Sequence, residues 1–142
     1  MLSKISAGLA LYRTRAGNVE ILLVHPGGPF WKHKDAGVWS IPKGEIKEGE
    51  IDLLGVAQRE FQEETGFIPT GTFTTLGSVK NNKTGKILHA WAFAGDCDPT
   101  QLRSNTCFID WPPRSGKELE IPEVDRAEFF TLTAARSAKK FS

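Results

Sequence analysis

The 142-residue sequence has few of the features that mark secreted, membrane-spanning or nucleic-acid-binding proteins. Its two cysteines, Cys97 and Cys107, are too few for a disulfide framework and lack the paired spacing of a zinc site. The formal net charge of +1 argues against charge-driven binding to nucleic acid or to a membrane surface. No apolar stretch approaches the roughly 20 residues of a membrane span, and the N-terminus has no signal-peptide core. We therefore expect a cytoplasmic protein with free thiols and with neither a membrane nor a nucleic-acid partner.

The residues that are present suit a single globular domain spanning residues 1–142. The apolar content of 39% is enough for a hydrophobic core, and no repeat, low-complexity tract or linker divides the chain. The three histidines, His25, His33 and His89, show no spacing typical of metal ligands. Oligomeric state is left open by the sequence.

Apolar runs between turn-forming residues predict several strands on both sides of one central helix. The expected extended segments are residues 5–14, 19–25, 38–42, 70–80, 87–94, 106–111 and 127–132. Residues 43–51 are expected to form a loop, and residues 133–141 a short final helix. Strands before and after one helix predict an α/β layered fold.

The central helix is expected to begin at an Asp52 cap and to end at Gly66, a residue suited to the left-handed position after a helix. Gly55 lies inside this helix, where it costs about 1 kcal/mol relative to alanine, so packing has to compensate. The apolar face of the helix comes from Leu54, Ala57 and Phe61.

Three glutamates, Glu60, Glu63 and Glu64, lie at i, i+3 and i+4 and therefore on one side of this helix. Three carboxylates so close repel one another, and a hard divalent cation such as Mg²⁺ would neutralise them. Gly44 allows its carbonyl to approach the same cation, and Arg59 can orient a carboxylate. For the three glutamates alone, a solvated helix face is the more common explanation.

The surrounding pattern changes this balance. The segment REFQEETGF, residues 59–67, resembles the second half of the Nudix box, G-x5-E-x7-R-E-U-x-E-E-x-G-U, where U is bulky and apolar. The preceding WSIPKG, residues 39–44, is similar to the usual lead-in of that family. One feature departs from the box: eight residues separate Glu50 from Arg59 instead of seven. Either the loop has one extra residue or Ile51 occupies the box's first glutamate position, and Glu50 is then in doubt as a partner of Arg59.

The resemblance implies a Nudix α/β/α sandwich with a central mixed sheet and a catalytic loop-helix-loop. It implies hydrolysis of a phosphoanhydride bond in a nucleoside diphosphate-linked substrate, by attack of water at phosphorus. Gly44, Glu60, Glu63 and Glu64 would hold Mg²⁺, with Mn²⁺ as a substitute. Glu63 or Glu64 would also act as the base, supported by Arg59; the family uses different glutamates in this role, so both stay open.

A further acidic residue often approaches the metals of this family from a loop near the last strand. Glu118, Glu120 and Glu123 are the candidates, and the sequence favours Glu123, with an exposed loop carboxylate as an equally common alternative. Residues that would meet the substrate are Lys43, Trp39, Lys80 and Lys83. Solvated turn lysines and core aromatics are the alternatives for these residues.

Substrate class is less evident than reaction class. Residues 82–85 hold neither the proline nor the tyrosine that marks two Nudix subgroups, those acting on ADP-ribose and on dinucleoside polyphosphates. The lead-in is nevertheless similar to that of diadenosine tetraphosphate and diphosphoinositol phosphate hydrolases, and the whole chain looks like bacterial Nudix proteins predicted to be NTP pyrophosphohydrolases. We favour a nucleoside triphosphate or a dinucleoside polyphosphate such as Ap4A. The alternatives are ADP-ribose, a diphosphoinositol phosphate, a non-catalytic nucleotide-sensing module or an interaction domain with an acidic helix.

Overall fold

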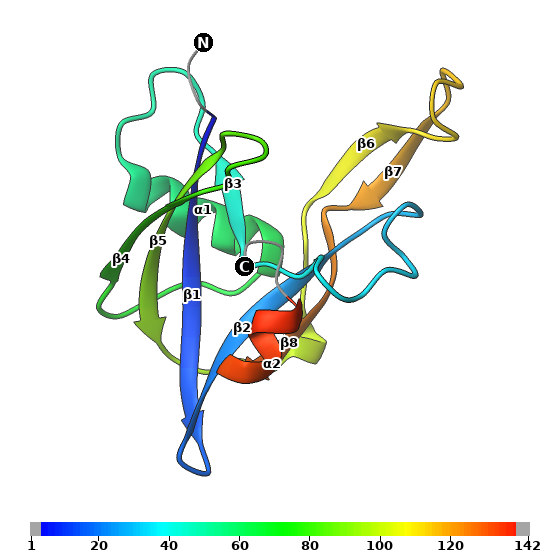
Figure 1. The fold of residues 1–142 in the computed structure, drawn as a ribbon. Coiled ribbons are helices and arrows are strands. Elements are labelled where there is room, and N and C mark those ends of the chain that lie inside the picture. The colour runs from blue at the N-terminus through cyan, green and yellow to red at the C-terminus, as the bar shows by residue number, and fades with distance from the viewer. Residues whose placement is uncertain (1–3, 139–142) are drawn as a thin grey trace.

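A mixed six-stranded sheet between two helices organises the chain, as Figure 1 shows for the computed structural model, which describes residues 4–138. The elements are β1 (Ile5–Arg15), β2 (Asn18–Pro26), β3 (Lys43–Glu45), α1 (Leu53–Thr65), β4 (Thr74–Lys80), β5 (Ile87–Ala94), a 3₁₀ turn η1 (Pro99–Gln101), β6 (Thr106–Asp110), β7 (Glu118–Pro122), β8 (Val124–Thr131) and α2 (Leu132–Ala138). Neither α-helix in this part of the chain has the length and apolar character needed to cross a bilayer.

Strands β1 and β2 separate along part of their length, and β3 enters the space between them. The order is β4-β5-β1-β2-β8, with β1 parallel to β5 and antiparallel to β2. Strand β1 pairs with β2 only over Tyr12–Arg15 and with β3 over Ser6–Gly8, so β3 fills the space where β2 has moved away. Backbone hydrogen bonds from Leu9 to Pro42 and from Val24 to Ser40 fix the segment that leads into β3.

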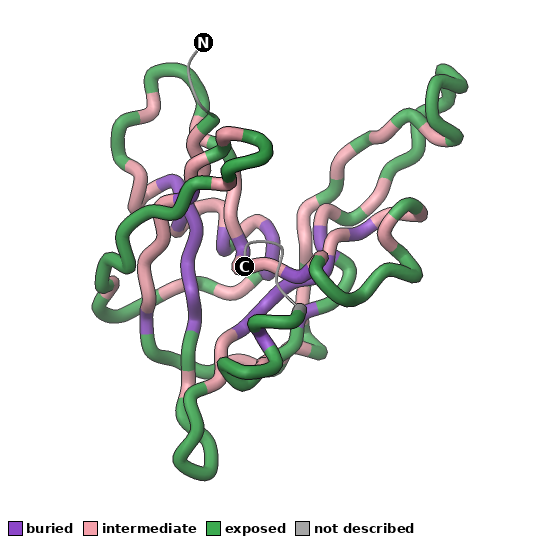
Figure 2. The backbone as a smooth tube through the Cα atoms, viewed as in Figure 1, coloured by how far each residue is buried: buried purple, intermediate pink, exposed green. Residues whose placement is uncertain are grey.

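Each face of the sheet is covered by one helix. Strand β1 is buried on both faces in its central part, which appears as the long purple segment in Figure 2. On the α1 side, the first core cluster contains Leu9, Leu22, Ala57, Phe61 and Phe93. On the α2 side, Leu23, Trp39 and Ala135 form a second, smaller cluster. Fully burying a side chain such as Phe61 is worth about 1.5–3 kcal/mol, so this packing fixes α1 against β1.

Helix α1 is closed at both ends by the residues that the sequence indicates. Asp52 accepts a hydrogen bond from the Gly55 amide at 3.0 Å, and Gly66 has φ of 79° at the C-terminal end. The same cap explains Gly55: a Cβ there would lie 2.5 Å from an Asp52 carboxylate oxygen. A side chain at position 55 would therefore displace the Asp52 carboxylate from its capping position.

Strands β6 and β7 form a separate two-stranded ribbon that extends from the sheet. Gly27 and Gly28, directly after β2, lie against the base of this ribbon. A Cβ at Gly27 would come within 2.1 Å of the Pro122 carbonyl oxygen, and one at Gly28 within 2.7 Å of Ile121. The ribbon and the loop that follows β2 are therefore in direct contact.

Several sequence-based boundaries need correction. Residues 43–45, expected in a loop, form β3 because the opening between β1 and β2 leaves backbone groups of β1 to be paired. Strand β7 and η1 were not predicted, although Glu118–Ile121 alternates charged and apolar residues in the manner of a strand. The segment expected over 70–80 is extended only from Thr74, and the last strand begins earlier, at Val124. Part of the helix expected over 133–141 lies outside the described residues.

Replacing Asp52 by alanine should lower the free energy of unfolding by about 0.5–2 kcal/mol, because the Gly55 amide loses its acceptor. Urea denaturation of the wild type and the variant measures this difference. Asp52→Asn keeps an acceptor oxygen and should recover most of the loss. Equal losses in both variants would show that the cap is unimportant.

Candidate active site

The three glutamates of α1 occupy different environments on the side of the helix that approaches β3. Glu64 is 7% exposed, whereas the side chain of Glu63 retains 41% exposure. Glu64 accepts a hydrogen bond from the Lys43 backbone amide at 3.3 Å, which joins the helix to the first residue of β3. The buried carboxylate is therefore held by the sheet and the outer one is left to solvent.

Gly44 lies directly against Glu60. A Cβ at Gly44 would come within 2.2 Å of the Glu60 carboxyl carbon, so any side chain there would displace the glutamate. The pairing of Ala7 with Gly44 fixes this contact, because it holds β3 against β1 and under α1. The glycine predicted to approach a metal therefore does approach a carboxylate that the sequence assigns to the same site.

Arg59 joins the loop before the helix to the glutamate cluster. Its guanidinium donates to Glu50 at 2.7 Å and to Glu60 at 3.4 Å, and lies 3.7 Å from Glu63. The pairing with Glu50 removes the doubt raised by the extra residue. That residue is accommodated in the loop, where Ile51 is 93% exposed and Glu50 keeps its position by accepting from the Lys47 amide. The hydrogen bond from Arg59 is the main reason that the pKa of Glu50 is lowered.

Glu123 is the acidic residue that the fold brings to the helix glutamates. It lies between β7 and β8, and its backbone amide donates to the Asn105 carbonyl at 3.0 Å. The side-chain amide of Asn105 contacts the Glu123 carboxylate at 3.4 Å, and its backbone amide donates to the Glu63 carbonyl. Asn105 thus connects the end of α1 to Glu123. The sequence gives no signal for it, because the connection joins residues far apart along the chain.

The other two acidic candidates lie elsewhere. Glu118 and Glu120 belong to the ribbon strand β7, where both are exposed. Glu120 accepts a hydrogen bond from the Thr106 hydroxyl at 2.9 Å, across to β6. They are not brought to the helix glutamates.

Burial and mutual repulsion disfavour ionisation throughout the cluster. Burial raises the pKa of Glu64 to about 8, with further increases from Glu123 and Glu60 and an opposing effect of the nearby Lys43 charge. Burial, followed by the charge of Glu63, also raises the pKa of Glu60 and of Glu123. Four carboxyl groups from two parts of the chain therefore share one electrostatic environment with an excess of negative charge.

The donor chemistry of this cluster fits a hard divalent cation. All the carboxylate donors are oxygen atoms, which Mg²⁺ and Mn²⁺ prefer, and Gly44 lies directly against Glu60. Among the described residues, no three acidic, histidine or cysteine side chains are already arranged as a complete metal-binding group. Glu60 is instead held by Arg59 and Glu64 by the Lys43 amide, so binding would require these side chains to rotate.

A cavity of about 210 Å³ opens beside the buried glutamate. Its polar residues include Lys43, Glu64 and Glu123. Its apolar lining includes Val24, Pro26, Trp31, Val38 and Val124. One cavity thus combines carboxylates and a cationic side chain with an apolar wall that contains an indole.

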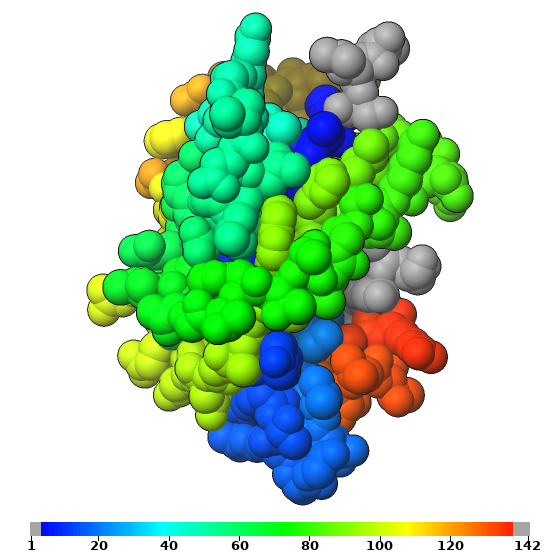
Figure 3. All heavy atoms as spheres, turned by 90° about the vertical axis from the view of Figure 1, so that its left-hand side faces the viewer, coloured from blue at the N-terminus to red at the C-terminus, as the bar shows by residue number. Residues whose placement is uncertain are grey.

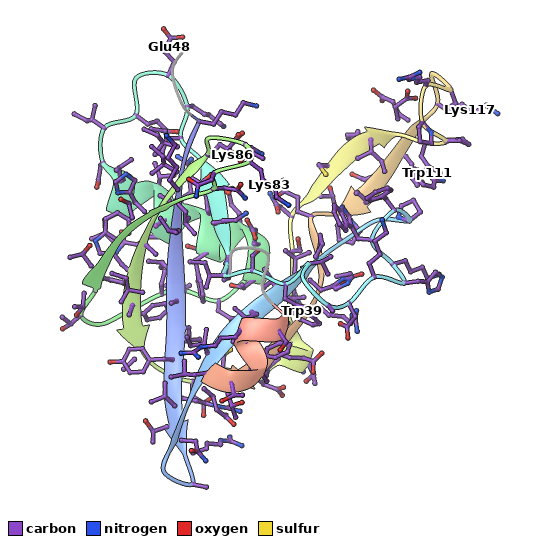
Figure 4. All side chains as sticks on the ribbon, viewed as in Figure 1. Trp39, Glu48, Lys83, Lys86, Trp111 and Lys117 are labelled. Atoms are coloured by element: carbon purple, nitrogen blue, oxygen red, sulfur yellow. The ribbon has the colours of Figure 1, made fainter. Side chains whose placement is uncertain are left out.

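The remaining residues expected to meet the substrate lie outside this cavity. Trp39 is 2% exposed and donates to Asp35 at 2.7 Å, so it supports the loop and presents no open face for stacking. Lys80 ends β4, and Lys83 lies in the turn between β4 and β5, where both are exposed. Figure 4 shows Lys83 on this turn and Trp111 on the ribbon, which lie on different arms of the molecule. Figure 3 shows the outer face of the β4–β5 turn and of the loop before α1.

Comparison with known proteins agrees with this architecture. The model of the NUDIX domain matches residues 2–142. Nudix hydrolase 7 of Arabidopsis thaliana is 30% identical over 126 residues, which are 85% of this chain and 43% of that protein. The chain therefore spans less than half the length of this relative.

Two solved structures illustrate the fold. The NUDIX domain of Shewanella oneidensis NrtR, solved with ADP ribose, has a TM-score of 0.66 and 15% identity, covering 99% of this chain and 81% of that one. A binary complex of a C. elegans Ap4A hydrolase has a TM-score of 0.61 and 23% identity, covering 95% and 85%. The fold and the matching domain model define a Nudix-type α/β protein, and the chain belongs to the NUDIX domain family.

The metal-free protein should lose stability as pH rises, and Glu64→Gln should remove much of this dependence. The pKa of Glu64 is raised from 4.5 to about 8, so the folded state binds the proton more tightly than the unfolded chain. Its stabilising contribution is complete below pH 4.5 and is lost as pH rises through about 8. Urea denaturation in EDTA across this pH interval should show the free energy of unfolding falling less in the variant than in the wild type. A constant difference would contradict the burial of an ionisable Glu64.

Proposed function

We propose that the chain is a Mg²⁺-dependent pyrophosphohydrolase that cleaves a phosphoanhydride bond in a nucleoside diphosphate-linked substrate. The observation that carries the proposal is the convergence of Glu60, Glu63, Glu64 and Glu123 beside one cavity that also contains Lys43. A water oxygen attacks phosphorus, the bridging P–O bond breaks, and the leaving phosphate departs with the bridging oxygen. No covalent enzyme intermediate is needed.

The residues proposed to hold the metal are Glu60, Glu63, Glu64, Glu123 and the Gly44 carbonyl. A bound Mg²⁺ would supply neutralisation of phosphate charge and activation of water, and Mn²⁺ is the expected substitute. Glu63 or Glu64 accepts the proton of the attacking water. Arg59 is a positioning residue, since its contacts orient the glutamates on either side of it.

The substrate is proposed to place its phosphates near Lys43 and its base against Trp31. Lys43 and Trp31 line the same cavity, so one nucleotide can reach both. Lys80 and Lys83 are proposed to meet a longer polyphosphate, which favours a nucleoside triphosphate or a dinucleoside polyphosphate such as Ap4A. ADP-ribose, diphosphoinositol phosphates and a purely sensing role are the alternatives. The complete set of glutamates favours hydrolysis over sensing.

The wild type should release products from one of ATP, dATP, GTP, 8-oxo-dGTP, Ap4A, ADP-ribose or a diphosphoinositol phosphate with Mg²⁺, and not in EDTA. Glu64→Gln should lower kcat about 10²- to 10⁴-fold, as expected from loss of a catalytic carboxylate. Product formation measured by chromatography tests both points. Glu120→Gln is a matched control on the ribbon and should keep wild-type turnover. Nucleotide binding without any turnover would instead identify a sensing module.

Replacing Trp31 by alanine should raise KM for the best nucleotide about 5- to 100-fold, the effect expected from loss of one base-stacking contact. Because Trp31 is assigned to the base and not to the reacting phosphates, kcat should change little. Trp111→Ala, on the ribbon, is the matched control. Steady-state kinetics with an unchanged KM for Trp31→Ala would place the base elsewhere.

A further inference from the structure

His25, the eighth residue of β2, is fully buried and faces two hydrogen-bond acceptors. Its Nδ1 lies 2.7 Å from the Asp125 carboxylate, and its Nε2 lies 2.6 Å from the Lys34 carbonyl oxygen. A neutral imidazole has one donor nitrogen and one acceptor nitrogen, so it can satisfy only one of these partners. Only the imidazolium, with a proton on each nitrogen, donates to both.

The charged and polar groups around His25 agree with this assignment. Asp125 supplies the counter-charge, and Arg126 approaches the same carboxylate oxygen at 3.8 Å. The indole of Trp39 lies edge-on to the imidazole at 5.2 Å and donates to Asp35. Apolar residues of similar volume often stabilise a core as well as a buried ion pair does. The best-attested use of such a pair is to fix one conformation of the surrounding chain.

The Lys34 carbonyl belongs to the turn that contains Trp31, one of the residues that line the cavity. The Lys34 amide donates to the Trp31 carbonyl at 2.9 Å, and the Lys34 ammonium lies 3.7 Å from the centre of the Phe30 ring. Phe30 in turn packs edge-on against Trp31. The turn is therefore a small packed unit, and its position determines where Trp31 lies.

The other partner of His25, Asp125, leads to further residues that line the cavity. Asp125 follows Glu123 and Val124, which both line the cavity. Within the part of the chain that the structure describes, one buried ring thus connects the strand behind Glu123 to the turn behind Trp31.

We infer that His25 is a positioning residue that holds the Trp31 turn at the cavity by donating a hydrogen bond from Nε2 to the Lys34 carbonyl, while Asp125 holds the ring. The inference rests on the proposed function only for its kinetic consequence, which is tighter nucleotide binding. The Nε2 bond, and not the bulk of the side chain, sets the affinity.

Two substitutions separate the two hydrogen bonds. The amide nitrogen of asparagine falls near the position of Nδ1, and that of glutamine near the position of Nε2. His25→Asn therefore keeps a donor for Asp125 and loses the one for Lys34, whereas His25→Gln does the reverse. His25→Asn should raise KM about three- to tenfold, as for one lost hydrogen bond, with kcat little changed. His25→Gln should stay close to the wild-type KM.

Hydrogen exchange supplies a readout that needs no turnover, so it keeps its meaning if the hydrolase proposal fails. Amides of residues 31–37 should exchange faster in His25→Asn than in His25→Gln. His33→Asn, an exposed histidine of the same loop, is the control and should match the wild type. Equal changes in KM and exchange for both His25 variants, in step with their melting temperatures, would show a merely structural residue. No change in either variant would also overturn the inference.

The wild type alone gives a test if the variants do not fold. Nitrogen-15 spectra of the histidine rings should show a proton on Nε2 of His25. A ring without a proton on Nε2 would overturn the inference, because the Lys34 carbonyl would then face a lone pair.

Discussion

The close approach of β3 to α1 is the constraint on which the site depends. Gly44 contacts Glu60, and the Lys43 amide holds Glu64, so the strand fixes both carboxylates of the helix. This approach requires β1 and β2 to separate, because β3 occupies the space between them. The same arrangement keeps carboxyl groups out of water beside one another, which is unfavourable unless protons or a cation neutralise them.

The cavity beside these carboxylates is lined by residues from several parts of the chain. Its charged residues are Lys43 of β3, Glu64 of α1 and Glu123 between β7 and β8, whereas its indole belongs to the loop after β2. The buried imidazole between β8 and that loop links the two parts. A nucleotide bound as proposed contacts the carboxylates and a part of the cavity lining whose position depends on a few hydrogen bonds. Affinity and turnover are expected to respond to different substitutions for this reason.

The sequence predicted the parts of the site that are local along the chain. The spacing of Glu60, Glu63 and Glu64, the cap at Asp52 and the end at Gly66 all depend on one helix, and the mixed sheet is as expected. Asn105 and the pairing of β3 depend on contacts between distant segments, which periodicity does not reveal. Trp39 was expected to meet the substrate but is buried in the core. The sequence alone does not separate these two roles for an aromatic residue next to a motif.

The central claim, that the glutamates form a site for a divalent cation, is tested most directly by calorimetric titration of Mn²⁺ into the metal-free protein. The titration is run near neutral pH in two buffers of different ionisation enthalpy. The account predicts saturable binding with release of protons, because Glu64, with a pKa of about 8, is largely protonated before the metal binds. Glu64→Gln should bind more weakly and release fewer protons. Absence of binding to the wild type, or identical binding and proton release in the variant, would contradict the account.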